Sequence, residues 1–549
     1  MPLALDAVSP DRLMQAAERV RLAHDVVLPS LIHLNTSPCL EHSLTSAEPV
    51  LGCVRCGMRP RRHQRTAATW LFLARKALLA DQMGVGKSLS AMTTLAMAAQ
   101  AGELDPARGG GRVLVVCRPP ALDQWRQELC RALPRLVTEI ADGPASARSD
   151  RYAEPWQILI MGYQMLQKDI DVIERLGIHH LIVDDVDPIR HSNTKTAWTI
   201  KRLANQCARV MVLSGTPLQK KLEELYDIYT LFGGARVLDT KSAFKNRYTV
   251  AEPVTIRTKG NVKRTISHVS HHRRLSEFKE LTAHFAMRRT VADIDDVDLP
   301  DVIPSNIFLE LHPAQRERYD ELAAGVVRLV HSQGTSVKQA TALTKILYGA
   351  QICEGLAALG EPDGSGASVK LDWLMAQLTG DWSGEGATDP GEKVVCFVQF
   401  KAGVRALVER LRRADIGHVV VWGEDRDRAS RTAAVARFWQ DPGCRVLIGT
   451  AAIEQSLNLQ VSRRIVNVDQ LINPARMNQL AGRVRRIGSV HQAVYVHNLL
   501  TVDTHEERIL ALLESEAALA GHIWGEQDPI YNALTPIQLL TAISPAVAQ

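Results

Sequence analysis

The sequence has no long apolar run, few cysteines and little excess charge of either sign. No uncharged stretch approaches the roughly 20 apolar residues that a membrane-spanning helix needs. Nine cysteines among 549 residues, most of them single within apolar runs, exclude a disulfide scaffold. With 46% hydrophobic and 23% charged residues, the composition also excludes a disordered, collagen-like or coiled-coil chain. Among these classes of protein, only an ordinary globular protein fits the composition.

The N-terminal stretch MPLALDAVSPDRL contains Asp6 and has no basic segment before its apolar residues. Because a secretory signal begins with such a segment, we do not expect one here. We expect an intracellular, cytoplasmic protein without a membrane partner. High usage of Ala and Arg suggests a bacterial or phage source, so the protein would act in the bacterial nucleoid or in a phage-infected cell.

Two series of short apolar runs divide the chain. At about 150 residues per domain, the length predicts three or four structural units. Runs rich in Val, Ile and Leu recur with helix-length spacers at 78–83, 113–117, 158–163, 181–185 and 210–215, and again at 394–400, 418–423, 445–450, 464–469 and 493–500. Such runs are typical of buried parallel strands. The sequence therefore predicts an α/β fold with two units in tandem.

The segment between the two series is expected to be helical, and it is basic. Its residues 256–274 carry six Lys or Arg and no acid, and we expect His268, His271 and His272 there to be loop residues. The predicted organisation is an N-terminal segment at 1–57, a first lobe at 58–238, a helical insertion and linker at 239–367, a second lobe at 368–514 and a tail at 515–549. No pattern in the tail predicts a function.

A glycine-containing loop follows the first apolar run and precedes a helical pattern. It reads Asp81-Gln82-Met83-Gly84-Val85-Gly86-Lys87-Ser88. Glycines let backbone N–H groups wrap phosphates at a helix N-terminus. We expect Gly84, Gly86 and Lys87 to bind nucleotide phosphates and Ser88 to bind Mg²⁺. Asp81 replaces the first glycine of the general pattern, and the plainer alternative is that the glycines serve only the turn.

A second apolar run ends in Asp184-Asp185-Val186-Asp187. A carboxylate at a strand tip facing the phosphate loop would hold Mg²⁺, which we assign to Asp184. Asp185 would then orient or deprotonate the attacking water, a role worth about 10²–10⁴-fold. Taken alone, these acids could equally form a solvated turn.

The order of motifs resembles that of the Swi/Snf-type branch of superfamily-two helicase-like ATPases, the DNA translocases that include chromatin remodellers. The resemblance extends from about Met58 to Leu513. In the first lobe it rests on residues 59–64, 79–88, 113–129, 158–166, 214–219, 223–225, 287–290 and 299–300. It implies two RecA-like P-loop lobes that use ATP and Mg²⁺, with Gln64 against the adenine. It also implies that Arg118 and Thr216 contact DNA.

In the second lobe the resemblance rests on residues 394–400, 449–450, 457–459, 469, 473–474 and 479–488. It implies DNA contacts at Thr450 and Asn458 and a nucleotide contact at Gln479. By the same resemblance, Arg483 and Arg486 are arginine fingers. The chemistry fits, because a planar guanidinium offers several donors to a transferring phosphoryl group. An isolated GRVRR could otherwise be a solvated basic helix.

The chain departs from the family pattern at several positions. Asp185 replaces the usual Glu, and Asp187 replaces the usual His. The shorter carboxylate must come closer or act through a second water, and placement errors near 1 Å can cost ~10²-fold in rate. Other departures are Lys220, 453–456 and Ser489. We expect ATP hydrolysis and leave open whether its rate is reduced.

Two close ligand pairs, Cys39-x-x-His42 and Cys53-x-x-Cys56, lie in the N-terminal segment. Three thiolates and one imidazole suit tetrahedral Zn²⁺, so we predict a structural zinc site. The alternative is unrelated buried thiols, with His42 an exposed loop residue.

Basic residues cluster just after the second pair, at Arg55, Arg59, Arg61, Arg62 and Arg65. Together with residues 256–274 they could contact DNA phosphates, or they could be solvated faces whose arginines pair with acids. Aromatic residues make up only 5% of the chain and are not interleaved with these clusters, which argues against base stacking on single strands. Backbone tracking along a duplex fits better.

The expected function is that of a DNA-dependent ATPase that translocates on double-stranded DNA and remodels protein–DNA complexes or forked and branched DNA. Repair, restriction and phage defence are possible settings, with a protein partner that the sequence does not identify. One alternative is a helicase that separates strands. Another is a nucleotide-gated DNA-binding scaffold that hardly hydrolyses ATP.

Overall fold

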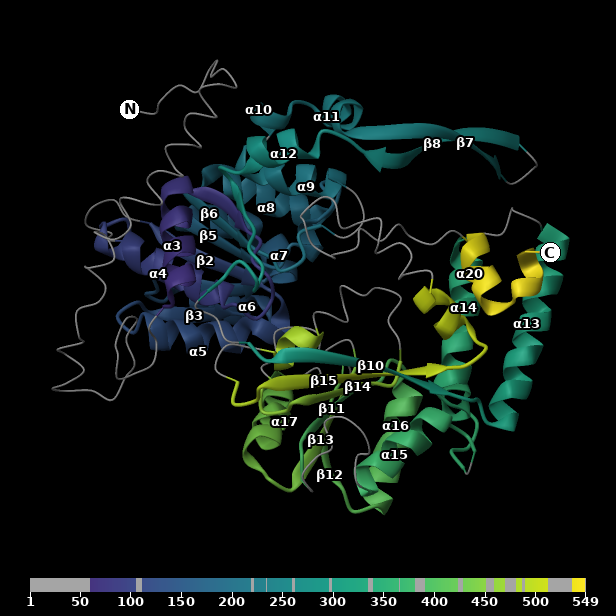
Figure 1. The fold of residues 1–549 in the computed structure, drawn as a ribbon. Coiled ribbons are helices and arrows are strands. Elements are labelled where there is room, and N and C mark those ends of the chain that lie inside the picture. The colour runs from purple at the N-terminus through teal and green to yellow at the C-terminus, as the bar shows by residue number, and fades with distance from the viewer. Residues whose placement is uncertain are drawn as a thin grey trace. The chain divides into compact units, whose positions relative to one another are not determined.

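The computed structural model describes residues 60–104, 111–218, 222–233, 235–258, 262–295, 299–333, 339–364, 366–380, 391–422, 428–450, 459–469, 480–485, 489–511 and 536–548 (Figure 1). These residues divide into two compact units. Unit 1 takes in the residues up to Glu252 together with those of 269–298, and unit 2 takes in 253–268 together with those from Leu299 onward.

Unit 1 is built on a seven-stranded sheet with the order β3-β4-β2-β5-β6-β1-β9, in which every neighbouring pair is parallel. The strands are β1 (Lys76–Leu79), β2 (Arg112–Cys117), β3 (Thr138–Ala141), β4 (Ile158–Gly162), β5 (Ile178–Asp184), β6 (Arg209–Leu213) and β9 (Ala286–Met287). The central strands read as nearly continuous apolar runs because both faces of the sheet are covered.

Helices follow the strands of unit 1, as parallel connections require. They are α3 (Arg62–Ala74), α4 (Lys87–Gln100), α5 (Leu122–Ala132), α6 (Ala145–Ala153), α7 (Tyr163–Ile173), α8 (Lys195–Gln206), α9 (Leu222–Tyr229), α10 (Ala235–Leu238), α11 (Lys241–Tyr248) and α12 (Leu275–Thr282), with short 3₁₀ turns at η3 (Pro119–Ala121) and η5 (Asp187–Ile189). Trp70 of α3, Leu95 of α4 and Trp125 of α5 bury their side chains with Val113 and Val115 of β2 in one core. This core holds the start of α4 against the end of β1.

Unit 2 is built on a six-stranded sheet with the order β10-β15-β14-β11-β13-β12, again with parallel neighbours throughout. Its elements are β10 (Asp301–Leu309), α13 (Pro313–Gln333), α14 (Gln339–Glu354), η8 (Leu356–Leu359), α15 (Val369–Thr379), β11 (Val394–Phe397), α16 (Lys401–Arg413), β12 (Gly417–Val421), α17 (Arg428–Gln440), β13 (Cys444–Gly449), β14 (Arg464–Asn467), β15 (Ala493–Thr501), α20 (Pro536–Ile543) and η10 (Pro545–Ala548). Each of the ten predicted apolar runs overlaps a strand, so the prediction of two parallel-sheet α/β units is confirmed.

The expectation of a helical segment at 239–367 is wrong for part of its length. Strands β7 (Thr249–Thr258) and β8 (Val262–His272) pair with each other. Strand β9 belongs to the unit 1 sheet, and strand β10 belongs to the unit 2 sheet. β-branched residues recur through β7 and β8, which favours strands over the helix that the basic composition suggested. The histidines expected in a loop, at 268, 271 and 272, lie in β8. The strand β10 escaped prediction because it contains Pro304, which a strand accepts at the edge of a sheet.

Within the described ranges, no helix has both the length and the apolarity that crossing a bilayer requires.

Candidate active site

The predicted phosphate loop has the local geometry that its glycines allow. Gly84 and Gly86 both have left-handed backbone angles, with φ of 88° and 84°. Helix α4 begins directly after Gly86, so Lys87 is its first residue and Ser88 its second. The Lys87 ammonium donates hydrogen bonds to the Asp81 carbonyl at 2.7 Å and the Gln82 carbonyl at 3.0 Å. A cation and a helix N-terminus thus converge at the end of β1, which is an anion-binding arrangement.

Asp81, which replaces the first glycine of the general pattern, has a partner of its own. Its side chain is only 1% exposed and pairs with Arg289, whose Nε donates to Asp81 Oδ1 at 3.1 Å and whose Nη2 donates to Oδ2. Arg289 also donates to the His63 carbonyl at 3.0 Å. The segment around Arg289 runs along β1, because Ala80 and Gln82 donate their N–H groups to the carbonyls of Met287 and Arg289. The departure at Asp81 is therefore compensated by an ion pair that clamps the loop.

Gln64 lies beside the phosphate loop from helix α3. It is 3% exposed, and its Oε1 accepts from the Arg61 N–H at 2.9 Å while its Nε2 donates to the Val85 carbonyl at 3.1 Å. The neighbouring His63 ring bonds the same Val85 carbonyl at 2.9 Å. Gln64 thus braces the loop, and its contact with adenine stays a prediction.

Asp184, the last residue of β5, and Asp185, which follows it, are held differently. Asp184 Oδ2 accepts a 2.7 Å hydrogen bond from the indole N–H of Trp125. Asp185 has a left-handed backbone, with φ of 85°, and its N–H donates to the Leu213 carbonyl at 2.9 Å. Burial, and then the Asp187 carboxylate, raise the pKa of Asp185 above its ordinary value, while Arg118 opposes this rise. These carboxylates are therefore placed by specific contacts, unlike those of a freely solvated turn.

The structure places Arg118 among these acids. Its Nε donates to Asp185 Oδ2 at 2.6 Å, and its Nη2 donates to Asp187 Oδ2 at 3.1 Å. The side chain is 24% exposed. A DNA contact was predicted for Arg118, but the group it holds in this structure is the catalytic candidate Asp185.

Arg190 connects these acids to the segment after β6. It pairs with Asp187, and it donates to the Thr216 carbonyl at 2.9 Å, the Pro217 carbonyl at 2.9 Å and Glu224 Oε2 at 3.1 Å. The side chain is only 4% exposed. The predicted DNA-contacting residue Thr216 is thereby joined, through one guanidinium, to the carboxylates.

The segment after β6 also touches the phosphate loop. A Cβ added at Gly215 would lie 2.4 Å from Met83 Cγ and 3.5 Å from Lys87 Nζ, so only glycine fits. The ends of β1, β6, β5 and β2 are consecutive in the sheet order, and each carries one part of the site. In a parallel sheet these carboxyl ends share one edge, where ligands bind.

In unit 2, part of the predicted site lies outside the described residues, namely Asn458, Gln479 and Arg486. Thr450 directly follows β13, and its N–H donates to the Val421 carbonyl at 3.3 Å. Arg483 is half-buried, and its carbonyl accepts from the Leu459 N–H at 3.0 Å.

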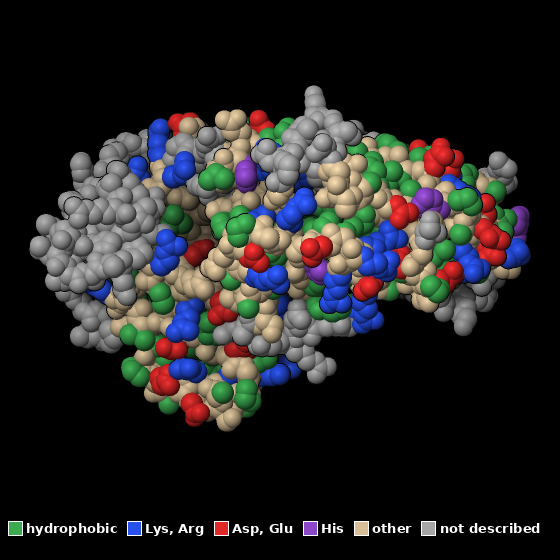
Figure 2. Space-filling view, turned by 90° about the horizontal axis from the view of Figure 1, so that it is seen from below, with side chains coloured by type: hydrophobic (Ala, Val, Ile, Leu, Met, Phe, Trp, Pro, Cys, Tyr) green, Lys and Arg blue, Asp and Glu red, His purple; other side chains and the backbone are tan. Residues whose placement is uncertain are grey.

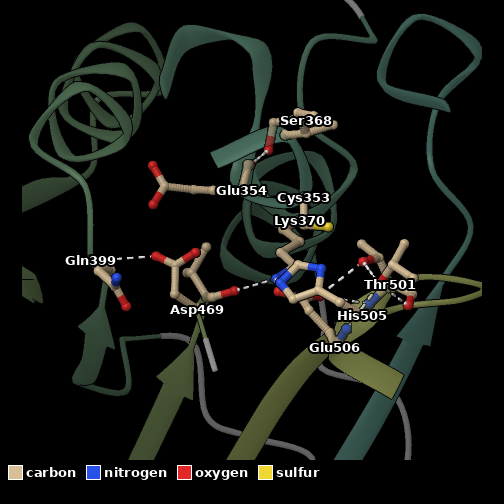
Figure 3. A network of polar contacts seen from close by, with 12 residues as sticks. Cys353, Glu354, Ser368, Lys370, Gln399, Asp469, Thr501, His505 and Glu506 are labelled. Carbon is tan, nitrogen blue, oxygen red and sulfur yellow. Dashed lines mark hydrogen bonds and ion pairs between the residues drawn. The ribbon is translucent and has the colours of Figure 1, made fainter. Parts of the chain in front are cut away.

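A buried ionic network that we did not predict lies beside Asp469 in unit 2 (Figure 3). Lys370 of α15 is 0% exposed and donates to Glu506 Oε1 at 2.6 Å and to the Val468 carbonyl at 2.8 Å. Burial opposes its charge, but Glu506 and Asp469 raise the pKa of Lys370 overall. Glu506 is held in turn by the N–H and hydroxyl of Thr501, both at 2.9 Å.

Two further carboxyl groups hold the backbone after β11. Asp469 Oδ2 accepts from the Gln399 N–H at 2.6 Å, and Glu354 Oε2 accepts from the Phe400 N–H at 3.2 Å. Burial, and then the Asp469 carboxylate, raise the pKa of Glu354 well above its ordinary value. Through these two backbone contacts, Glu354 and Asp469 join α14 to the ends of β11 and β14.

Two of the basic residues that were candidates for contacts with DNA phosphates have partners within the protein. Arg62 pairs with Asp295 at 3.2 Å, and Arg273 donates to the carbonyls of Asn246 and Arg247 at 2.5 and 3.2 Å. On the face in Figure 2, Lys and Arg side chains are spread among acidic and apolar ones. Arg62 and Arg273 thus fit the alternative interpretation, in which these arginines bind groups of the protein itself.

Among the described residues, no group of three or more His, Cys, Asp or Glu is arranged to hold a metal ion. The four predicted zinc ligands, Cys39, His42, Cys53 and Cys56, lie outside those residues.

Sequence reasoning missed Arg190, Arg289 and Trp125 as site residues. Arg289 lay in a segment already quoted for its family resemblance, and the available signal was an acid, Asp81, in a phosphate loop that would need a cation to offset it. Arg190 and Trp125 gave no such signal, because each acts through a contact between separate elements.

Two family models match the chain. The SNF2-related domain matches residues 63–357, and the helicase conserved C-terminal domain matches residues 370–488. A Bacillus subtilis protein with the provisional name ATP-dependent helicase/translocase YwqA is 24% identical over 84% of this chain and 48% of its own length. The SNF2 domain-containing protein ENL1 of Oryza sativa is 26% identical over 83% of this chain and 51% of its own length.

The chain spans about half the length of these curated relatives. Among solved structures, the Sulfolobus solfataricus SWI2/SNF2 ATPase core in complex with dsDNA is 22% identical, with a TM-score of 0.39, over 84% of this chain and 92% of that chain. Because the SNF2-related domain alone matches more than half of the sequence, this chain belongs to the SNF2-related family.

Proposed function

We propose that the protein is a DNA-dependent ATPase that couples ATP hydrolysis to translocation on double-stranded DNA. The observation that carries this proposal is the edge of the unit 1 sheet, where four neighbouring strands end in a phosphate loop, a Gly-Thr-Pro segment, paired carboxylates and an arginine. Membership of the SNF2-related family supports the same reading. Remodelling of protein–DNA complexes or of forked and branched DNA would follow from such movement, with a protein partner still to be identified.

Each part of this edge has a proposed role. Lys87 binds the β- and γ-phosphates, and the loop amides between Gly84 and Ser88 surround them. Ser88 and Asp184 would hold Mg²⁺, whose oxygen preference they meet and which would neutralise phosphate charge. Asp185 orients the attacking water and accepts its proton.

Arg190 provides a path from hydrolysis to movement. It holds Asp187 on one side and the carbonyls of Thr216 and Pro217 on the other, so a shift at the acids reaches the proposed DNA-contacting segment. For unit 2 the family resemblance supports nucleotide contacts at Gln479, Arg483 and Arg486 and DNA contacts at Thr450 and Asn458.

The test is phosphate release measured with no DNA and with duplex, single-stranded, forked and branched DNA in parallel. We expect duplex-containing DNA to stimulate release and the Lys87→Ala variant to release none above background. Equal release by wild type and Lys87→Ala on every substrate would refute the enzyme. The preferred substrate in the panel would show which DNA structure the protein engages.

Two alternatives are separable by experiment. A strand-displacement assay distinguishes a translocase from a helicase that separates strands. A nucleotide-gated scaffold is favoured by one observation, the short and Arg118-bound carboxylate of Asp185. If that reading holds, Asp185→Glu should raise the turnover sharply.

We also propose a structural zinc ion held by Cys39, His42, Cys53 and Cys56, supported by the spacing of the two ligand pairs. Metal analysis of protein purified without chelators should give about one zinc per chain. A content below half an equivalent, or one that survives Cys53→Ser with Cys56→Ser, would argue against this site.

A further inference from the structure

Arg118 occupies the carboxylate that the proposed reaction needs. It follows β2 directly and precedes Pro119 and Pro120, which stiffen the turn into α5. Its guanidinium meets two acids at once, Asp185 at 2.6 Å and Asp187 at 3.1 Å. This fork is a charge-assisted arrangement, the stronger class of hydrogen bond.

Both oxygens of Asp185 are engaged in this arrangement. Oδ2 accepts from Arg118, and Oδ1 accepts from the Asp187 N–H at 3.1 Å. A water that is to give its proton to Asp185 must approach one of these oxygens within about 2.6–3.2 Å. Each oxygen keeps a second acceptor site, so Arg118 does not exclude water but competes with it for Oδ2.

The structure also provides for the departure of Arg118. Asp187 keeps a second cation, Arg190, which bonds its other oxygen. If Arg118 moves away, Asp187 therefore keeps its ion pair with Arg190, and only Asp185 loses its cationic partner. The side chains of Arg118 and Asp185 are 24% and 30% exposed, so an incoming anion can reach the pair.

We propose that Arg118 is a latch that occupies Asp185 in the DNA-free protein and moves to a backbone phosphate of bound duplex DNA, so that DNA binding frees Asp185 to activate water. A guanidinium that forks between two carboxylates offers the same planar donors to a phosphate. This inference rests on the proposed function and adds to it the step by which DNA stimulates hydrolysis.

The test compares phosphate release at saturating ATP, with and without duplex DNA, for wild type and Arg118→Ala. We expect Arg118→Ala to raise the DNA-free rate about tenfold or more, with the ~10²–10⁴-fold that a positioned base supplies as the upper limit. The ratio of stimulated to unstimulated rate should fall toward one. Arg118→Gln, which keeps a donor but no charge, should behave similarly and replaces the alanine variant if that variant does not fold.

The matched control is Arg202→Ala. Arg202 also bridges two acids of unit 1, Asp171 at 2.8 Å and Glu174, but lies on α8 outside the site. It should leave both rates unchanged.

Three outcomes would overturn the latch. Equal loss of both rates in Arg118→Ala would make Arg118 a positioning residue for Asp185. An unchanged DNA-free rate with a higher DNA requirement would make it a DNA contact only, and unchanged rates throughout would exclude any role. A wild type that no DNA stimulates would instead remove the proposed function itself, and the latch with it.

Discussion

Replacing Asp185 with asparagine is expected to lower DNA-stimulated phosphate release by about 10²–10⁴-fold, because the side chain that accepts the water proton is lost. Asparagine retains one oxygen, which can accept the hydrogen bond from Arg118 or the one from the Asp187 N–H, since these reach different oxygens of Asp185. It also tolerates a left-handed backbone better than most residues, which suits the φ of 85°. The loss should therefore fall on the chemical step, and ATP binding should persist.

The measurement is a single-turnover rate beside an equilibrium binding titration with a fluorescent ATP analogue. Asp169→Asn is the matched control, since Asp169 also holds an arginine of unit 1, Arg148, at 2.6 and 2.9 Å and lies outside the site. Retention of more than a tenth of the wild-type rate by Asp185→Asn would assign the base to another residue.

Replacing Lys370 with methionine is expected to lower the free energy of unfolding of unit 2 by about 3–5 kcal/mol. The substitution keeps an apolar stem of similar length but leaves Glu506 and Asp469 buried without their shared cation. Hydrogen exchange, read by mass spectrometry, would locate the loss in α15 and the adjoining strands of unit 2 while unit 1 keeps its protection.

Two further variants test the cause of that loss. Lys393→Met removes a half-buried lysine whose partners are the carbonyls of Asp441 and Cys444, so it should cost less. Glu506→Gln placed in the Lys370→Met background should recover part of the stability, because it removes the stranded charge. If the double variant is less stable than Lys370→Met, the stranded-charge explanation does not hold.

Features that depend on neighbouring residues in the sequence were predictable. The phosphate loop is an example, since glycines, Lys87 and a following helical pattern are consecutive. The ten apolar runs likewise gave most strands of both sheets, all except β3, β9 and β10. Contacts across long separations were not predictable, because nothing in the pattern around Asp185 specifies Arg118 as its partner. The same holds for Lys370 and Glu506, which are 136 residues apart and read in isolation as surface residues.

The prediction of a helical segment at 239–367 was wrong for a different reason. Its charge and length suggested helices, but strand formation there is decided by pairing, with β7 on β8 and β10 on β15. The β-branched residues of β7 and β8 were a local signal for strands, but β-propensity is weak evidence until the pairing is known.

The clamp between Asp81 and Arg289 also bears on the order in which the protein folds. The two residues are 208 positions apart, and the strand pair that brings them together, β1 with β9, lies at the edge of the sheet. A chain emerging from the ribosome can form β1 and α4 long before Arg289 is synthesised. Until then Asp81 would be an unpaired carboxylate beside the proposed phosphate site, where it would repel phosphates. On the proposed function, the competence to bind nucleotide would arise late in synthesis, although the loop itself lies in the first fifth of the sequence.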